Sequence, residues 1–565
     1  MKKSQTSKAG EPGRWQPWAL AGAAAVLAFL VYRPALGGDF VFDDRYLPIL
    51  GRGAANSWLG DWVGWNRPIL MLSFWLQLRL FGQEPYSYHL ANLLLHLVNS
   101  ALVFVIARRL IGWAGESGRR NAFLAGFAAA LFLLHPLQTE SVSYIASRSE
   151  ALSATFFLGS LAVFLGRRSE AVSWSNAALA LALFGAAVLT KEHTAVLPAL
   201  FLLTDYYWNP GFSLAGIKKN WRLHAPVLLL GAGGLVFVWR ALQQSGRTAG
   251  FRVEGVAWYE YFFTQCRVIW TYIRLYVLPV GQNLDPDIPI SRGLLDHGAV
   301  IGLAGLAALA AAAWMWRKRE PLASYGVLAF LLLLAPTSSI VPIRDLAAER
   351  RMYLPILGLI LATIALMRRW RAGTGALTAV IALVAFATYQ RNQVWAGSIG
   401  LWADTVAGSP SKVRPRFQLA FAYYEAGRCG EAAREFETAS KLGQPNYELL
   451  VDWGLALDCD GQYQAAVERF EHAARLESTA HVYALLGMVH GKRGNRQMAL
   501  VALARAESID KNYDMTYAYR GNLFFVADDF ERAAAEFRRA LGLNPSNPAA
   551  QQGLRAAEGR LRAPR

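Results

Sequence analysis

The sequence predicts an all-α protein, in which a polytopic membrane helix bundle is followed by a soluble array of helical repeats. Uncharged stretches recur up to about residue 390, such as 182–189, 227–238 and 327–335. Each lies in a window of roughly 17 to 20 residues, which is long enough to cross a bilayer as a helix. After about residue 410 charges recur every few residues, and small residues repeat with a period of 33 or 34.

Eleven membrane spans are predicted from the apolar stretches. Their approximate ranges are 17–36, 89–107, 122–136, 150–166, 176–190, 194–208, 224–241, 299–316, 323–341, 352–367 and 374–390. A cleaved signal peptide is the alternative for the first of them. The segment 256–280 is excluded from the count, because Arg267 and Arg274 share one helical face among many aromatic residues. This pattern is typical of an interfacial amphipathic helix.

Six basic clusters between the apolar stretches determine the predicted orientation. They are Lys2, Lys3, Lys8 and Arg14; Arg108, Arg109, Arg119 and Arg120; Arg167 and Arg168; Lys218, Lys219 and Arg222; Arg317, Lys318 and Arg319; and Arg368, Arg369 and Arg371. The positive-inside rule assigns such clusters to the cytoplasm. Eleven crossings put all six on that side, with the N-terminus inside and the C-terminus outside.

Composition excludes two other classes of protein. The net charge of +17 could indicate nucleic-acid binding, but much of the excess lies in these topology clusters. The three cysteines, Cys266, Cys429 and Cys459, form neither a disulfide framework nor a CxxC metal motif. Cys429 and Cys459 could pair in an oxidising compartment, although we favour two small buried thiols.

The C-terminal part reads as four tetratricopeptide repeats. The recurring positions are Ala420, Gly454, Gly487 and Gly521; Ala432, Ala466, Ala499 and Ala533; Phe436, Phe470, Leu503 and Phe537; and Ala439, Ala473, Ala506 and Ala540. We predict repeats at 413–446, 447–479, 480–513 and 514–547, with a capping helix at 548–560. The domains are then 1–400 and 401–565, and the concave face of such an array usually binds a protein or peptide.

Polar motifs fall at the outer ends of the predicted spans. Asp43 and Asp44 follow the first span, in an outer loop predicted over 37–88. Charged groups near a membrane edge are costly, which favours a functional reason for them. An acid that accepts a hydroxyl proton, with cations around a leaving phosphate, is what an inverting glycosyl transfer needs.

The ordered motifs resemble a known family. They are Phe42-Asp43-Asp44, Asn66-Arg67-Pro68, Tyr88-His89, His135-Pro136-Leu137-Gln138-Thr139-Glu140, Ser147-Arg148-Ser149-Glu150, Thr190-Lys191-Glu192, Pro336-Thr337-Ser338-Ser339, and Ala348-Glu349-Arg350-Arg351-Met352-Tyr353. Together they are similar to GT-C glycosyltransferases with tetratricopeptide repeats, namely the transmembrane and tetratricopeptide-containing O-mannosyltransferases and their bacterial relatives. The resemblance implies inverting transfer from a polyprenyl-phosphate sugar to Ser or Thr hydroxyls of an exported protein, which the repeats engage.

The resemblance also assigns roles to residues. It implies that Asp43 is the catalytic base, with Asp44 as the alternative. The candidate donor-binding residues are Arg67, His89, His135, Glu140, Arg148, Lys191, Glu192, Glu349, Arg350, Arg351 and Tyr353. No metal site is predicted. A divalent cation stays open as an alternative that nothing in the sequence supports, and the lipid-linked sugar is the substrate. His193 and Glu150 stand where the family often has Gly and Asp, so the sugar stays open.

Two other functions compete with this one. A non-enzymatic assembly or transport factor would use the membrane part as an anchor and the repeats as an interaction module. An oligosaccharide ligase that uses a diphosphate-linked glycan would centre on a late outer loop, for which 344–351 is the candidate. The Ala- and Arg-rich composition suggests a bacterial inner-membrane protein with a periplasmic repeat domain.

Overall fold

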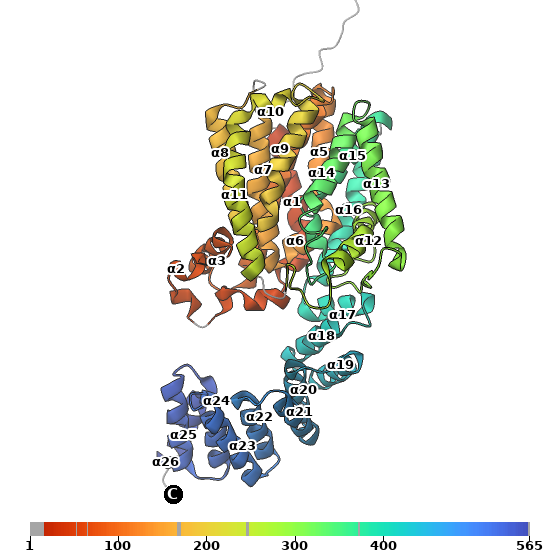
Figure 1. The fold of residues 1–565 in the computed structure, drawn as a ribbon. Coiled ribbons are helices and arrows are strands. Elements are labelled where there is room, and N and C mark those ends of the chain that lie inside the picture. The colour runs from red at the N-terminus through yellow and green to blue at the C-terminus, as the bar shows by residue number, and fades with distance from the viewer. Residues whose placement is uncertain are drawn as a thin grey trace, which may run out of the picture. The chain divides into compact units, whose positions relative to one another are not determined.

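The protein is helical throughout the residues that its computed structural model describes, which are 16–51, 53–64, 66–166, 171–244, 248–370 and 373–562. Within these ranges the only β-type pairing is an isolated bridge between Ala249 and Ile343. The chain divides into two compact units, Met1–Leu401 and Trp402–Arg565, which we call the membrane unit and the repeat unit (Figure 1). The all-α fold class is confirmed.

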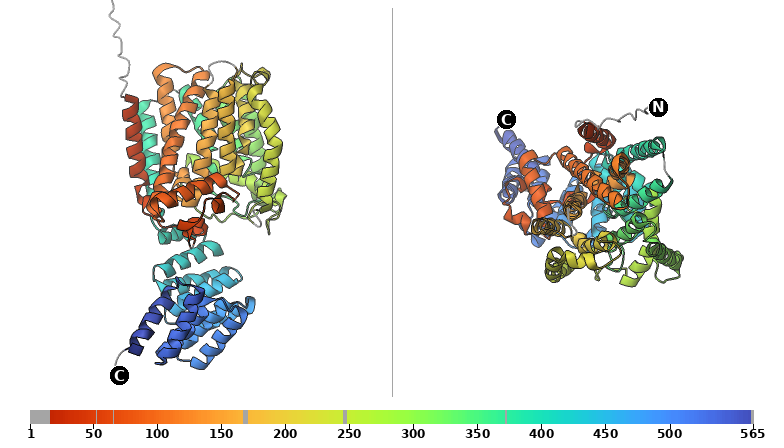
Figure 2. Two further views of the ribbon diagram at one scale, coloured as in Figure 1. Left: turned by 90° about the vertical axis from the view of Figure 1, so that its left-hand side faces the viewer. Right: turned by 90° about the horizontal axis from the view of Figure 1, so that it is seen from above.

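A helix coincides with each of the eleven predicted spans. They are α1 (Gln16–Leu36), α4 (Pro85–Trp113), α5 (Gly118–Leu134), α7 (Arg148–Leu165), α8 (Trp174–Thr190), α9 (Leu197–Trp208), α11 (Trp221–Gln244), α13 (Ala299–Trp316), α14 (Pro321–Leu334), α15 (Ile356–Trp370) and α16 (Thr374–Val394). Figures 1 and 2 show these helices side by side in one bundle.

Among the described residues, fewer than the eleven predicted helices are both long enough and apolar enough to cross a membrane. Among the described residues four segments qualify: Ala19–Leu36, Pro85–Trp113, Ile145–Leu165 and Asp296–Trp316. A fifth qualifies if Gly118–Leu134 and Pro136–Ser143, which meet at a 52° bend, form one span. Several others are too short, because the 14 residues of α14 extend only about 21 Å at 1.5 Å per residue. These four or five apolar helices mark a membrane protein.

Basic residues gather at one end of the membrane unit. The Arg120 guanidinium donates to the Arg368 carbonyl at 3.2 Å. Glu116 lies between these two arginines, at 3.7 Å from Arg120 and 3.8 Å from Arg368. Arg369 pairs with Glu320 at 3.4 Å. The α4–α5 turn, the start of α14 and the end of α15 therefore meet at one end, which brings basic clusters from separate parts of the chain together.

The opposite end of the bundle carries further helices, from the 4 residues of α2 to the 20 residues of α12. Figure 1 shows α2 (Gly60–Val63), α3 (Pro68–Phe81), α6 (Thr139–Ser143) and α12 (Trp258–Val277) there, and α10 (Ala215–Lys219) at the basic end. The α3 helix lies within the stretch predicted as an outer loop, and the sequence patterns did not reveal it. Lys2, Lys3, Lys8, Arg14, Arg167, Arg168 and Arg371 of the basic clusters lie outside the described residues.

The repeat unit contains four helix pairs, one within each predicted repeat. They are α18 (Val413–Glu425) with α19 (Cys429–Leu442), α20 (Tyr447–Cys459) with α21 (Tyr463–Leu476), α22 (Ala480–Lys492) with α23 (Arg496–Ile509), and α24 (Asp514–Val526) with α25 (Phe530–Leu543). A last helix, α26 (Pro548–Arg562), follows them, and α17 (Ser398–Gly408) precedes them. The tetratricopeptide architecture is confirmed.

Glycine is required where the paired helices cross. A Cβ atom added at Gly454 would lie 2.5 Å from the Phe470 ring, and one at Gly521 would lie 2.7 Å from the Phe537 ring. These separations are far below van der Waals contact. The periodic small residues therefore mark the contact line of each pair.

The Gly454→Ala variant should destabilise the repeat unit by about 1–3 kcal/mol, the usual cost of overpacking a close-packed core. Gly542→Ala is the matched control, because an added Cβ there has no neighbour within 4 Å. Alanine at that helical position should be neutral or slightly stabilising. Thermal unfolding of the full chain, followed by circular dichroism, measures both. Equal effects at the two positions would contradict the packing argument.

Cys429 and Cys459 form a disulfide, with their Cα atoms 5.7 Å apart. The expectation that both would be separate buried thiols is therefore wrong. Cys429 begins α19 and Cys459 ends α20, and stacking of neighbouring repeats brings these helix ends together. The pairing depends on that packing, since 30 residues separate the two cysteines along the chain. Disulfides of this kind persist mainly in oxidising compartments.

Candidate active site

The two adjacent aspartates lie in a short 3₁₀ turn, Phe42–Tyr46, that follows α1. Phe42 adopts a φ of 49°, a left-handed conformation that costs energy for a bulky residue. The Asp43 side chain is exposed and makes no hydrogen bond or ion pair within the described residues. Its backbone N–H donates to the Tyr144 phenol oxygen at 2.9 Å. The turn is therefore strained and is held to the end of α6 through Tyr144. The Asp43 carboxylate stays exposed.

Asp44 is the opposite case, because it is fully buried. Its carboxylate accepts hydrogen bonds from the backbone N–H groups of Val41 at 3.0 Å and Ala146 at 2.6 Å. Burial raises the pKa of Asp44 to about 8, and the charge of Asp43 adds a smaller increase while the two amides oppose it. Burial therefore raises the pKa of Asp44 more than repulsion from Asp43 does. Asp44 anchors the loop to the segment Ile145–Ser147.

The raised pKa of Asp44 predicts a loss of stability toward alkaline pH. A folded-state pKa of about 8 against an ordinary 3.8 means that folding favours the protonated form. The stabilisation is complete below about pH 4 and is lost as the pH rises through about 8, at up to about 1.4 kcal/mol per pH unit. Thermal unfolding measured from pH 5 to 9 should show a shallower decline for Asp44→Asn. Parallel profiles would contradict the assignment.

Arg67 and Glu192 form a bidentate ion pair across 125 residues of sequence. The Arg67 Nε and Nη2 atoms each lie 3.0 Å from a Glu192 carboxylate oxygen. Arg67 stands at the start of α3 and Glu192 directly after α8, so the pair joins the first loop to a later span. Arg67 is 38% exposed, and its Nη1 is not used by Glu192. Glu192 therefore holds the Arg67 guanidinium in place and leaves the Nη1 donor for another partner.

Lys191 is held by the N-terminal turn of α7. Its ammonium donates to Glu150 at 2.6 Å and to the Ser149 hydroxyl at 3.0 Å. Glu150 is nearly buried and also lies 3.6 Å from His193. A buried carboxylate needs such a partner, because an unpaired charge there is strongly destabilising.

Arg350 is the third braced cation. Its guanidinium pairs with Glu140 of α6 and, at 3.1 Å, with Asp345. Its backbone N–H also donates to Glu140 at 2.9 Å. Glu140 is buried, so one carboxylate fixes both the backbone and the side chain of Arg350.

The three cations and the aspartates belong to one electrostatic cluster. Lys191 experiences the charges of both Arg67 and Arg350. Burial raises the pKa of Tyr144, as do the charges of Asp44 and Asp43, whereas the charge of Arg350 lowers it. Tyr144 therefore lies within electrostatic reach of both the acidic turn and the nearest cation. Residues from five separate segments, at 43–44, 67, 144, 191 and 350, therefore belong to this cluster.

Glu349 anchors the segment after α12. Its carboxylate accepts hydrogen bonds from the Gln282 amide and, at 2.8 Å, from the Asn283 backbone N–H. Burial raises the pKa of Glu349 to about 7; the Arg391 charge lowers it and the Glu140 charge raises it. Glu349 thus fastens a loop at the edge of the cluster, with no open oxygen toward a ligand.

Two predicted donor-binding residues are engaged in packing. His135 uses both ring nitrogens, with Nε2 2.9 Å from the Tyr276 carbonyl and Nδ1 accepting from the Leu137 N–H at 3.2 Å. The Tyr353 hydroxyl lies 2.8 Å from His96 Nδ1 and accepts from the Asn99 amide at 2.9 Å. Neither presents a free polar atom in this arrangement.

Three further predicted residues contact neutral groups, and one of them, His89, has a buried Nδ1 with no hydrogen-bond partner among the described residues. Arg148 donates to the Asn92 amide oxygen and the Tyr88 carbonyl, and lies 4.4 Å from the centre of the Phe74 ring. His89 Nε2 lies 3.2 Å from the Gly38 carbonyl. Arg351 donates to backbone carbonyls, including that of Asp345, and to the Tyr261 hydroxyl. These contacts join the helices around the cluster.

Sequence reasoning missed two members of the cluster. Tyr144 was not singled out, although its phenol holds the backbone of Asp43. Glu150 was noted only as a departure from the family pattern, and its pairing with Lys191 was not foreseen. The available signal was the acid in the α7 first turn and the basic residue directly after α8. Their pairing depends on the contact between these two helices.

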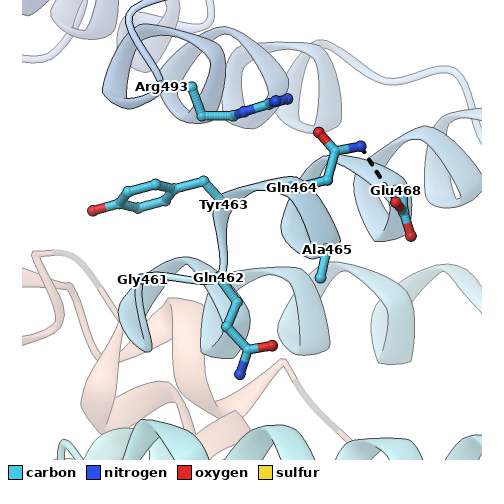
Figure 3. Close-up of a pocket in the computed structure, with 7 residues that line it drawn as sticks. All are labelled: Gly461, Gln462, Tyr463, Gln464, Ala465, Glu468 and Arg493. Atoms are coloured by element: carbon cyan, nitrogen blue, oxygen red, sulfur yellow. Dashed lines mark hydrogen bonds between the residues drawn. The ribbon is translucent and has the colours of Figure 1, made fainter.

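Within the described ranges no group of three or more His, Cys, Asp or Glu side chains could hold a metal ion. A pocket of about 480 Å³ lies in the repeat unit, at the turn into α21 (Figure 3). Tyr463, Gln464 and Glu468 line it with Arg493, and the Gln464 amide donates to Glu468 at 3.3 Å. None of the predicted site residues contributes to it.

Comparison with known proteins supports the resemblance that the motifs predicted. No protein-family model matches the chain. Protein O-mannosyl-transferase TMTC1 of Homo sapiens is 25% identical over 502 residues, which cover 75% of this chain and 55% of that protein. The chain resembles the protein O-mannosyl-transferases. Protein O-mannosyl-transferase Tmtc1 of Drosophila melanogaster is 35% identical over 193 residues, or 31% of this chain.

The chain spans only part of these relatives, covering 21% of the Drosophila protein and 55% of the human one. Among solved structures, the crystal structure of YrrB, a TPR protein with an unusual peptide-binding site, is 18% identical and covers 28% of this chain and 81% of that chain. Its TM-score of 0.24 is too low to carry an argument. The repeat architecture rests on the helix pairs described above.

Proposed function

We propose that the chain is an inverting GT-C membrane glycosyltransferase. It moves a sugar from a polyprenyl-phosphate donor to Ser or Thr hydroxyls of exported proteins. The observation that carries the proposal is the exposed Asp43 carboxylate at the end of the bundle where three cations are each paired with an acid. The similarity to protein O-mannosyl-transferases supports the same class of reaction and makes a mannosyl donor the first to test.

Asp43 is the base in this proposal. Its carboxylate accepts the proton of the acceptor hydroxyl as the hydroxyl oxygen attacks the anomeric carbon. The bond between that carbon and the phosphate oxygen breaks on the opposite face, and the phosphate keeps the electron pair. Asp44 is less suited, because backbone amides occupy its carboxylate and no solvent reaches it.

Arg67, Lys191 and Arg350 stabilise the leaving phosphate. Negative charge grows on that group as the glycosidic bond breaks, so preorganised cations favour the transition state over the ground state. Arg67 is the best placed for direct contact, because its Nη1 is not used by Glu192. Glu192, Glu150 and Glu140 hold the cations in position before the donor binds.

The proposed orientation places the acidic end and the repeat unit outside the cytoplasm, which in a bacterium is the periplasm, and keeps eleven crossings. Two observations support it: the basic clusters that gather at the opposite end, and the Cys429–Cys459 disulfide. Maleimide–polyethylene glycol labelling of the denatured chain tests it. We expect Cys429 and Cys459 to react only after reduction. Cys266 is a free thiol and labels in either case, so attachment of more than one label without reductant, together with cytoplasmic behaviour of a reporter after residue 562, would contradict it.

The function is tested by glycoproteomics of exported proteins in the organism that carries the gene. Deletion should remove a set of Ser- or Thr-linked glycopeptides, and the wild-type gene should restore them. An unchanged glycopeptide set would favour a non-enzymatic assembly factor. Loss of a long lipid-linked glycan in place of protein glycopeptides would favour an oligosaccharide ligase.

A further inference from the structure

The α20 helix carries acids that the proposed reaction does not use. Glu448 and Asp452 lie four residues apart on one face, and Asp458 lies six residues further along, in the last turn of the helix. None of them belongs to a periodic packing position of the repeats. Acids on the first helix of a tetratricopeptide pair are well placed to meet a ligand on the concave face of the array.

Asp458 has an unused hydrogen-bond acceptor although it is almost buried. Its side chain is 8% exposed, and Oδ2 accepts from the Lys492 ammonium at 2.6 Å. Oδ1 is buried and has no hydrogen-bond partner among the described residues. Buried carboxylate oxygens are normally paired, so such an atom indicates a missing donor.

Asp452 adds a second acid without a partner. No hydrogen bond or ion pair of its side chain is present within the described part of the chain, and it is half-buried. Burial raises the pKa of Asp452 to about 7, and the charge of Glu448 adds to this. A bound cation would relieve both the burial cost and the repulsion.

Tyrosines from two other repeats lie within electrostatic range of the same acids. The charges of Asp452 and Asp458 both act on Tyr424 of α18. Asp458 and Tyr424 both act on Tyr519 of α24. Rings from the first and fourth repeats therefore lie close to carboxylates of the second. Carboxylates beside aromatic faces match a cationic side chain, which gains both an ion pair and a cation–π contact.

We propose that this face of the repeat unit binds an extended polypeptide through a Lys or Arg side chain, placed between Asp452 and Asp458 with Tyr424 and Tyr519 beside it. The inference rests on the proposed function only in taking the acceptor protein as the source of that polypeptide. It predicts that acceptor segments carry a basic residue near the modified hydroxyl.

Fluorescence anisotropy with the full-length chain in nanodiscs tests the proposal. The probes are a labelled Ser/Thr/Gly peptide with two lysines and the same peptide with norleucine in place of each lysine. We expect the lysine peptide to bind about tenfold more tightly. Asp452→Asn should abolish that difference, and Glu531→Gln, which removes an exposed acid of α25, should preserve it.

Equal affinity of the two peptides would overturn the proposal, as would an undiminished preference for lysine in Asp452→Asn. An equal loss in Glu531→Gln would also overturn it, because the preference would then reflect overall charge. Tyr519→Leu, which removes one ring without touching an acid, should weaken the lysine peptide about threefold. The anisotropy assay contains no sugar donor and measures binding alone, so a failure of glycosyl transfer and a failure of this inference give different results.

Discussion

In the Asp43→Asn variant we expect glycosyl transfer to fall by roughly 10²–10⁴-fold, the usual contribution of a general base. Asparagine keeps the shape of the side chain but cannot accept the acceptor's proton. The fold should not change, because the Asp43 carboxylate is exposed and makes no hydrogen bond within the described residues. The backbone N–H that donates to Tyr144 is retained. Transfer to a synthetic Ser/Thr peptide from a polyprenyl-phosphate sugar is the measurement.

Asp44→Asn is the matched control for this prediction. It removes a buried carboxylate that anchors the turn, so its effects should appear in unfolding and its pH dependence more than in transfer. A transfer rate in Asp43→Asn above about one tenth of the wild type, at equal protein level, would remove Asp43 as the base. Complete loss in a well-folded Asp44→Asn alone would move the role to Asp44.

The Lys191→Met variant should lose both stability and activity. Removing the ammonium leaves Glu150 buried and without its 2.6 Å partner, which costs about 3–5 kcal/mol for a buried pair. The double variant Lys191→Met/Glu150→Gln removes the stranded charge as well and should recover most of that stability. It should not recover transfer, because the cation beside the leaving phosphate is still missing.

Thermal unfolding and transfer assays on the same preparations separate these two effects. Lys441→Met is the control, since its pair with Glu437 is exposed and worth at most about 0.5 kcal/mol. Recovery of transfer in the double variant would show that Lys191 only neutralises Glu150. A stable Lys191→Met single variant would contradict the buried pairing itself.

Much of the helical framework follows from local patterns. The recurrence of Gly454, Gly487 and Gly521 located the repeat pairs, because each pair needs a small residue where its helices cross. Apolar stretches located the long helices in the same way. The number of membrane crossings could not be predicted from these patterns. Short helices such as α14 are apolar enough to cross a membrane but are not long enough. The α3 helix was missed because it lies in a stretch that the charge pattern placed outside the bundle.

The candidate site was only partly predictable. Asp43, Arg67, Lys191 and Arg350 stood out as charged residues at the ends of apolar segments. Their partners did not, because Arg67 and Glu192 are 125 residues apart and Arg350 and Glu140 are 210 apart. His135 was equally conspicuous in the sequence, yet its two nitrogens contact the backbone of Leu137 and, 141 residues away, of Tyr276. The residue type shows which chemistry a side chain can perform, whereas its neighbours in the fold decide whether its polar atoms are available for it.

The all-helical class, the register of the repeats and the pair of acids after the first apolar segment follow from local sequence patterns. Each depends on residues close together in the chain, where spacing alone decides which face of a helix they share. The burial of Asp44 beside an exposed Asp43, the pairing of three cations with acids, and the Cys429–Cys459 disulfide follow from packing. Burial and pairing of charges depend on segments brought together by packing, which no local pattern contains.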